Sequence, residues 1–344
     1  MGWFLMLRGH RTWIFDQKPV IVSTGTVGGP FEANGALAED FDLLHSDLWL
    51  REDSYEKAHR VMIEEAAQKA IEKGGIQKED VQFFLAGDLI NQITPTSFAS
   101  RSIGVPYLGL FGACSTSMEG LALGAAIINA KGAKYVLTGA ASHNAAVEKQ
   151  FRYPTEYGGQ KPPTSQWTVT GAGMALLSDK GEGPRVTSAT IGRVIDMGLS
   201  DPFNMGGAMA PAAVDTITAH LTERNIDPSY YDLIVTGDLG QIGHEVSLDL
   251  FKKQGIAIDD SFYSDCGLLI YKSEQPVLAG ASGAGCSATV VYGHLLNRMK
   301  KGELKRILVV ATGALLSPLS FQQKESIPCI AHAVSIEYGG ENTQ

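Results

Sequence analysis

The chain has 344 residues, of which 44% are hydrophobic and 19% charged, and its formal net charge is −9. This composition excludes a disordered chain, a coiled coil and a collagen-like chain, and the negative charge argues against a nucleic-acid-binding surface. The length exceeds that of one compact core, so we expect two domains or one large fused α/β unit. The four cysteines form no CxxC pair, which favours free thiols over a disulfide framework or a zinc site.

The first part of the chain predicts strands that alternate with helices. A helix of small residues begins after Gly112-Ala-Cys-Ser115. In chain order the predicted elements are a strand at 19–24, a helix at 56–73, a strand at 83–89, a helix at 118–130 and strands at 134–140 and 173–178.

The second part repeats this order at an offset of about 170 residues. Its cysteine helix begins with Ala284-Gly-Cys-Ser287 and runs to about residue 300. The other predicted elements are a strand at 185–190, a helix at 212–224 and strands at 233–236, 306–314 and 332–337. A short polar linker at 180–184 separates the repeats, so we divide the chain into residues 1–183 and 184–344. The alternation predicts parallel sheets in each half.

Two stretches without Asp, Glu, Lys or Arg, at 102–118 and 275–297, have the length of a membrane span. Both are rich in Gly, Ser and Thr, and the second contains His294. We interpret them as strand, turn and buried helix. The apolar start, Met1 to Leu7, is too short for a signal peptide, so we expect no transmembrane segment.

Two α/β halves, each with a cysteine at the start of a helix, resemble the thiolase and ketosynthase superfamily. The resemblance implies an α-β-α-β-α arrangement of five layers, in which two mixed five-stranded sheets enclose central helices. It also implies a homodimer that pairs through a strand of the first half, here near residues 135–139.

Cys114 stands where the superfamily keeps its acyl-accepting cysteine, and a helix N-terminus stabilises a thiolate. The alternative is a small buried thiol that packs between the central helices. Three other positions depart from the superfamily pattern. Val277 stands where thiolases have a histidine base, Ala281 where ketosynthases have an asparagine, and Asp238 where a histidine or asparagine is expected. We therefore predict a degenerate, non-catalytic member; the alternative is an acyl-thioester condensing or acyl-transfer enzyme that uses Cys114.

Longer strings are similar to the stage V sporulation AD family of spore-forming Firmicutes. They lie at 85–92, 110–119, 142–145, 150–162, 311–318 and 322–332. This resemblance implies a protein that binds dipicolinic acid, pyridine-2,6-dicarboxylic acid, for uptake into the developing spore. It implies membrane-embedded stage V A proteins as partners and a peripheral location at the inner membrane of the forespore and spore. No cofactor is implied, apart from calcium that would enter with the ligand.

Dipicolinate is a flat dianion, which calls for Arg or Lys, backbone N–H groups at a helix N-terminus and an apolar slot. We expect these groups near the start of the first cysteine helix and in the loops that follow the strands. The predicted ligand-binding residues are Asp88, Cys114, Ser115, His143, Asn144, Arg152, Tyr153, Lys161, Asp238, Ser282, Lys324 and His332.

Several of these residues have a second interpretation. Asp88 and Asp238 could bind calcium together with the ligand, or each could cap the turn that follows it. His143 could donate to a ligand carboxylate, or it could be a helix-capping or loop histidine. The loop with Arg152, Tyr153 and Lys161 could bind ligand, or pack on itself or on a second copy of the chain. Lys324 could be a solvated surface residue. The remaining histidines show no metal spacing, so no metal site of the protein's own is predicted.

Overall fold

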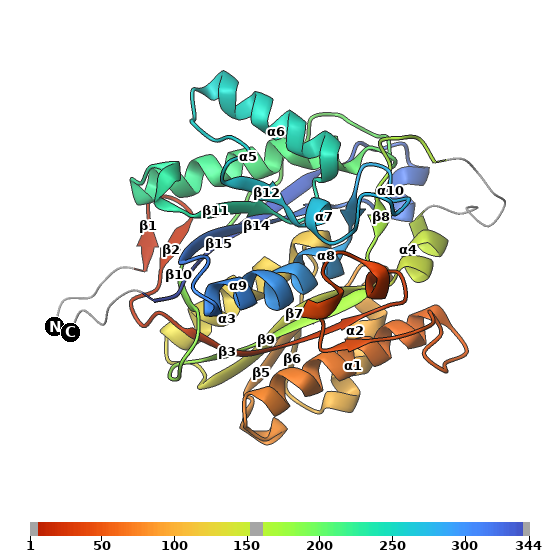
Figure 1. The fold of residues 1–344 in the computed structure, drawn as a ribbon, viewed down its shortest axis with the longest axis vertical. Helices are drawn as coiled ribbons and strands as arrows, with labels where there is room; N and C mark the ends of the chain where they lie inside the picture. The colour runs from red at the N-terminus through yellow and green to blue at the C-terminus, as the bar shows by residue number, and fades with distance from the viewer. Residues whose placement is uncertain (1–5, 152–160, 340–344) are drawn as a thin grey trace.

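The computed structural model describes residues 6–151 and 161–339. Five layers are stacked in it, in the order helices, sheet, helices, sheet, helices (Figure 1). The outer helices are α1 and α2 on one side and α5 and α6 on the other, and α3, α8 and α9 lie between the sheets. This is the predicted α-β-α-β-α arrangement.

Each half contributes one five-stranded sheet. The first has the order β3-β9-β7-β5-β6 and the second the order β10-β15-β14-β11-β12. The two sheets touch at a single residue pair, Arg185 with Val20. The strands of the first sheet are β3 (Val20–Gly28), β5 (Phe83–Gly87), β6 (Tyr107–Gly109), β7 (Tyr135–Ser142) and β9 (Gly171–Ser178). Those of the second are β10 (Arg185–Thr190), β11 (Leu233–Thr236), β12 (Tyr263–Asp265), β14 (Arg306–Ala314) and β15 (Cys329–Glu337).

Both sheets are mixed, so the expectation of parallel sheets from the alternation alone was wrong. Strands β5, β6 and β7 run parallel, whereas β9 pairs antiparallel with both β7 and β3. The second sheet repeats this pattern, with β15 antiparallel to β14 and β10. The reason is that the closing strand of each half returns beside its neighbour after a short helix, α4 (Asn144–Phe151) or α10 (Pro318–Gln322), instead of a crossover helix on the sheet face.

The outer helices cover the sheets closely. α1 (Tyr55–Lys73) begins at Ser54, whose side chain accepts a hydrogen bond from the Lys57 amide, and it lies against β3 and β9 with α2 (Thr94–Ile103) beside it. A side chain at Gly25 in β3 would stand 2.1 Å from the Ala66 carbonyl oxygen, so this glycine permits the close approach. α5 (Met205–Arg224) and α6 (Gly240–Gln254) cover the second sheet.

The central helices come from equivalent places in the two halves. α3 (Thr116–Asn129) follows Cys114, and α8 (Ala284–Thr289) contains Cys286. A π-helical stretch, Val290–Leu295, joins α8 to α9 (Leu296–Lys300), so one helical segment spans the predicted range. The side chains of Ser117 and Ser287, 170 residues apart, share a 2.7 Å hydrogen bond where α3 and α8 meet.

Short strands tie the halves together. β8 (Trp167–Thr168) and β13 (Ala281–Ser282) form a separate parallel pair that joins the first half to the second. β1 (Leu7–Arg8) pairs with β2 (Thr12–Ile14), which in turn pairs with β10, so the beginning of the described chain lies on the second sheet; β4 (Leu43–Leu44) pairs with β3. Within residues 6–151 and 161–339, no helix combines the length and the apolar character that crossing a membrane requires.

The strand expected to pair two copies of the chain, near residues 135–139, has no free edge. It is β7, and it lies between β5 and β9, with its backbone hydrogen-bonded on both sides. That expectation was wrong, because alternation along the sequence does not reveal the order of strands in a sheet. The free edge of the first sheet is β6.

Candidate functional site

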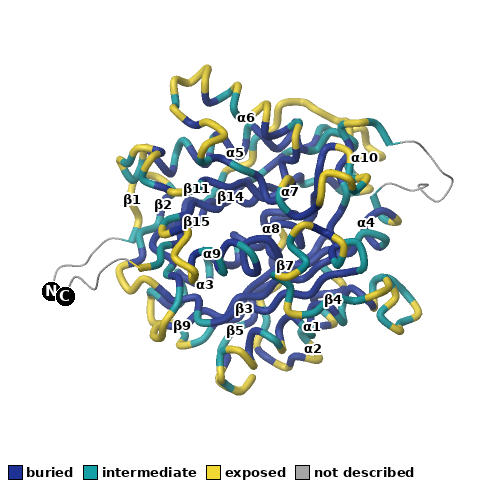
Figure 2. Tube along the Cα trace, in the orientation of Figure 1, coloured by how far each residue is buried: buried dark blue, intermediate teal, exposed yellow. Residues whose placement is uncertain are grey.

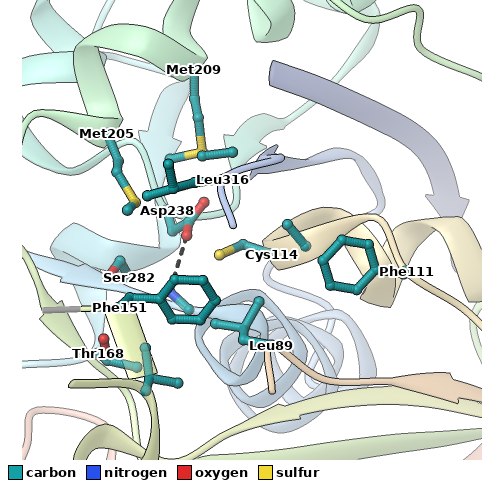
Figure 3. Close-up of a pocket in the computed structure, with 14 residues that line it drawn as sticks. Leu89, Phe111, Cys114, Phe151, Thr168, Met205, Met209, Asp238, Ser282 and Leu316 are labelled. Atoms are coloured by element: carbon teal, nitrogen blue, oxygen red, sulfur yellow. Dashed lines mark hydrogen bonds between the residues drawn. The ribbon is translucent and has the colours of Figure 1, made fainter. Parts of the chain in front are cut away.

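A small cavity of about 40 Å³ lies where the two halves meet (Figure 3). Its walls are mostly apolar, and its polar groups are concentrated around Cys114 and Asp238. The described residues that line it are Leu89, Phe111, Ala113, Cys114, Val147, Phe151, Thr168, Met205, Met209, Asp238, Ser282, Gly283, Ala314 and Leu316.

A tight turn holds Cys114 at the cavity. The 3-10 turn Ala113–Ser115 precedes α3, and Ala113 has a φ of 51°, a left-handed conformation that is costly for a residue with a side chain. The Ser115 hydroxyl donates to the Gly112 carbonyl at 2.6 Å and so closes the turn. A side chain at Gly313 in β14 would stand 2.2 Å from the same carbonyl, so the second half presses on this turn. The turn is thereby fixed from both halves.

Asp238 lies beside Cys114 at the cavity (Figure 3). It follows β11, and its carboxylate accepts hydrogen bonds from the Thr312 hydroxyl at 2.7 Å and from the Gly283 amide at 3.0 Å. The Cys114 side chain hydrogen-bonds to it as well. Burial, only partly offset by these donors, raises the pKa of Asp238 to about 6. Asp238 therefore changes charge close to neutral pH.

Three helices begin at this cavity. Cys114 lies just before α3, Gly283 lies just before α8, and Met205 is the first residue of α5. A helix N-terminus carries a partial positive charge. Among the described residues that line the cavity there is no Lys, Arg or His. The three helix N-termini therefore place partial positive charge at the cavity.

Asp88, equivalent to Asp238 in the repeat, does not line the cavity. It is fully buried, and its carboxylate accepts from the Ile90 amide at 2.7 Å and from the Thr96 amide at 2.9 Å. Burial raises its pKa to about 6. These contacts are those of a residue that caps the turn before α2, the second interpretation given above, and the neighbouring Leu89 lines the cavity in its place.

The two predicted histidines and Asn144 do not line the cavity, and backbone groups hold all three side chains. A ring nitrogen of His143 bonds to the Leu48 carbonyl oxygen at 2.8 Å, and Nδ1 of His332 accepts from the Gly192 amide at 3.2 Å. Burial lowers the pKa of each to about 4, so both rings are neutral at pH 7. The Asn144 side chain donates to the Thr168 carbonyl oxygen at 3.2 Å.

Lys161 and Lys324, the predicted cations among the described residues, do not line the cavity. Lys161 is paired with Glu148 at 3.0 Å, and its ammonium group lies 5.7 Å from the centre of the Trp167 ring. Lys324 is exposed on the turn after α10. Arg152 and Tyr153 lie outside the described residues. Of the twelve predicted residues, the structure brings Cys114, Asp238 and Ser282 together at the cavity, while Ser115 supports the turn behind them.

Sequence reasoning missed the apolar wall above Asp238, formed by Met205, Met209 and Leu316 (Figure 3). The predicted helix began at residue 212, because Pro211 and the Gly206-Gly207 pair weaken a helical pattern. The helix in fact begins at Met205, and its Asn204 N-cap accepts a hydrogen bond from the Gly207 amide. Met205 and Met209 are four residues apart, which places two side chains on the same face of a helix. This spacing was the signal in the sequence that the helix begins before residue 212.

The described residues contain no group of three or more His, Cys, Asp and Glu side chains placed to hold a metal ion. The four cysteines are buried and unbridged. Cys266 and Cys286 are fully buried, which raises the pKa of both thiols well above the usual value. Neither has the character of a reactive thiolate.

Comparison with solved structures shows a fold shared with condensing enzymes. The 3-oxoacyl-[acyl-carrier-protein] synthase III of Aquifex aeolicus is 15% identical with a TM-score of 0.58, covering 93% of this chain and 100% of that one. A variant of OleA from Xanthomonas campestris, bound with cerulenin, is 14% identical with a TM-score of 0.62, covering 94% and 98%. Human mitochondrial 3-ketoacyl-CoA thiolase is 12% identical with a TM-score of 0.59, covering 94% and 100%. The fold is thiolase-like.

Sequence comparison is more specific. The model of the stage V sporulation protein AD family matches residues 9–337. Stage V sporulation protein AD of Bacillus subtilis (strain 168) is 46% identical over 336 residues, which cover 98% of this chain and 99% of that protein. The chain therefore belongs to the stage V sporulation protein AD family, a family of sporulation proteins, and has a thiolase-like fold.

Proposed function

We propose that this protein binds dipicolinic acid, free or as its calcium complex, for uptake into the developing spore, and that it does so without catalysis. The observation that carries the proposal is the cavity between the halves, where three helices begin among apolar walls. Backbone N–H groups at helix starts suit carboxylates, and apolar walls suit a pyridine ring. Membership of the sporulation family supports this choice over other aromatic anions.

Asp238 sets the condition for binding. An ionised carboxylate repels a dianion at close range. Two states of the site avoid this conflict: Asp238 is protonated, which its pKa of about 6 makes accessible, or a calcium ion lies between the two carboxylates. In the second state the calcium enters with the ligand and is not a resident cofactor.

The residues around Cys114 support a binding role over condensation. A condensing enzyme needs a base and donors for the developing oxyanion. Val277, in the position of the expected histidine, cannot accept a proton, and Ala281 offers no side-chain donor. Asp238 contacts Cys114 directly, and a carboxylate there opposes both a thiolate and an enolate.

A second candidate function is acyl transfer through Cys114. The position of this thiol favours it: Cys114 lines the cavity and lies just before α3, and a helix N-terminus stabilises a thiolate. The mostly apolar lining would also accept an acyl chain. Incubation with an acyl-thioester followed by mass spectrometry tests this candidate, because a covalent acyl group on Cys114 would support it.

We further propose a homodimer and a peripheral location at the inner membrane of the forespore and spore, with membrane-embedded stage V A proteins as partners. For the dimer, the free edge of β6 is the available pairing strand, and Leu108 in this strand and Phe111 just after it are about half exposed. An apolar edge strand of this kind favours association with a second chain.

The site is tested by filling the cavity. Ala314 lines it at the end of β14, so Ala314→Phe places a ring in the space assigned to the ligand. We expect calorimetric titration to show dipicolinate binding lost in Ala314→Phe and unchanged in Lys324→Ala, whose side chain is exposed away from the cavity. Circular dichroism checks that both variants fold. Full binding by a folded Ala314→Phe variant would refute this site.

A further inference from the structure

A second buried carboxylate, Asp265, lies in the strand next to the one that leads to Asp238. Asp265 is the last residue of β12, and its partner in the parallel strand β11 is Thr236, two residues before Asp238. Asp265 is fully buried, in the interior around β11 and β14 that Figure 2 shows as buried. It is not one of the described residues that line the cavity. A carboxylate leaves water only at a cost, so its partners indicate what it does.

Four donors converge on the Asp265 carboxylate. Oδ2 accepts from the Thr236 hydroxyl at 2.7 Å and from the Leu239 amide at 2.8 Å. Oδ1 accepts from the Gly240 and Gly267 amides, both at 2.9 Å. The bond to Gly267 caps the short helix that follows β12. The other three bonds hold a different segment, from the end of β11 to the start of α6.

The three donors from this segment bracket Asp238. Thr236 lies two residues before it, and Leu239 and Gly240 are the two residues after it, so one carboxylate fixes the chain on both sides. Gly240 has a φ of 57°, and a side chain there would stand 2.4 Å from the Ala279 carbonyl oxygen. The segment therefore has little room to shift unless the bonds to the carboxylate break.

The first half holds the same point of the chain. Nε2 of Gln166 donates to the Asp238 carbonyl oxygen at 2.8 Å and to the Ala281 carbonyl oxygen at 2.9 Å. Gln166 thus fixes a carbonyl, whereas Asp265 fixes the amides beside it. With its backbone held in this way, the Asp238 side chain reaches the Cys114 thiol.

The chemistry of Asp265 exceeds what a helix cap needs. Burial and, to a lesser extent, the charge of the neighbouring Asp238 raise the pKa of Asp265 to about 7. An uncharged Asn or Ser caps a helix about as well and avoids this repulsion. An uncharged cap has a single acceptor oxygen, however, and cannot serve four donors at once. The carboxylate is therefore needed for the three bonds around Asp238.

We infer that Asp265 is a positioning residue of the cavity: without touching the ligand, its carboxylate holds the chain around Asp238 and so sets the Asp238 carboxylate against the Cys114 thiol. In what it says of the ligand, the inference rests on the proposed function. The contact between Asp238 and Cys114 belongs to the chain itself, so it can be measured without a ligand.

The test is the rate at which iodoacetamide alkylates Cys114 in the full chain, followed by mass spectrometry. At about pH 7.5 both carboxyls are mostly ionised, and alkylation requires the thiolate, which a neighbouring carboxylate disfavours. Asp265→Asn keeps the size of the side chain but loses acceptors, so we expect Cys114 to react at least about fivefold faster than in the wild type. Cys266 and Cys286 are fully buried and should stay unmodified, which separates this effect from general loosening.

A double variant shows whether Asp265 acts through Asp238. We expect Asp238→Asn/Asp265→Asn to react no faster than Asp238→Asn alone, because the carboxylate to be positioned is already gone. Asp232→Asn is the matched control and should react as the wild type does. Asp232 accepts from the Lys305 and Arg306 amides at 2.7 and 2.8 Å, at the opposite end of β11 and β14. Additive effects in the double variant, or a wild-type rate in folded Asp265→Asn, would overturn the inference.

Two milder variants decide the matter if circular dichroism shows that Asp265→Asn does not fold. Thr236→Val removes one donor and keeps the branched shape, so Cys114 should again react faster; Thr236→Ser keeps the hydroxyl and should react as the wild type does. A wild-type rate in Thr236→Val would then overturn the inference.

Dipicolinate titration in the presence of calcium separates this inference from the proposed function. A calcium ion between ligand and protein needs the Asp238 carboxylate in place, so we expect Asp265→Asn to bind at least about fivefold more weakly, and Asp232→Asn to bind as the wild type does. Faster, non-additive alkylation in a protein whose wild type binds no dipicolinate would support the positioning role and refute the proposed function alone.

Discussion

The protonation of Asp238 makes a quantitative prediction for ligand affinity. Burial raises the pKa of this carboxyl to about 6, and the carboxyl lines the cavity beside Cys114. If free dipicolinate binds only when Asp238 is neutral, affinity follows the protonated fraction. That fraction rises from roughly 3% at about pH 7.5 to roughly 76% at about pH 5.5, so the affinity should increase about 25-fold.

The assay is calorimetric titration in calcium-free buffer across this pH range, in which ordinary carboxylates such as those of the ligand stay ionised. With calcium present, the affinity for dipicolinate should instead decrease as the pH falls, because the ion binds only the ionised carboxylate. Asp238→Asn is the matched control: it keeps a polar group of similar size without charge, and we expect an affinity for the free acid that no longer depends on pH. Affinity that stays constant in the wild type without calcium would refute the role given to Asp238.

Three further predictions concern the fold and assembly. Gly25→Val should destabilise the protein by about 3 kcal/mol in denaturant unfolding, because its side chain would collide with the Ala66 carbonyl oxygen; a loss below about 1 kcal/mol would contradict this packing. Leu108→Arg, on the free edge of β6, should convert the proposed dimer to a monomer in light scattering, and a wild type that is already monomeric would remove the basis for the dimer. Glu32→Gln should make thermal stability fall on acidification from about pH 7 to about pH 5, whereas the melting temperature of the wild type should change little. Burial raises the pKa of Glu32 and Asp265 to about 7 and that of Asp88 and Asp238 to about 6, so the contribution of these four carboxyls to stability is present at low pH and lost as the pH rises through these values. The four buried histidines have pKa values lowered to about 3 or 4, so their contribution is present above about pH 6.5 and lost as the pH falls, and the two effects oppose one another. A wild type that melts much earlier at pH 5 would contradict this balance.

The duplicated strands and central helices could be predicted from sequence because each is a local pattern. The strand at 306–314 and the helical segment from Ala284 to Lys300 have the predicted bounds. Strand order depends on contacts between distant segments, so the sequence did not show that β7 is an interior strand. The start of α5 was missed because intrinsic propensity disfavours a helix across Pro211, and tertiary packing overrides that preference.

For the site, the repeat identified Cys114 and Asp238, because equivalent strand and helix ends meet at one edge of the sheets. Polar residues in loops were harder to assign. His143 and Asp88 carry side chains suited to a ligand, but the fold turns them toward the Leu48 carbonyl and toward the backbone before α2. Such partners are set by tertiary contacts that leave no pattern in the sequence.

The central claim is that the cavity beside Cys114 binds a ligand and performs no acyl chemistry. Its most direct test is calorimetric titration of the purified protein with dipicolinate, with and without calcium, together with mass spectrometry after incubation with an acyl-thioester. We predict saturable binding of one dipicolinate per chain and no covalent change at Cys114. No saturable binding under either condition, combined with an acyl group on Cys114, would contradict the claim and identify the protein as an acyl-transfer enzyme.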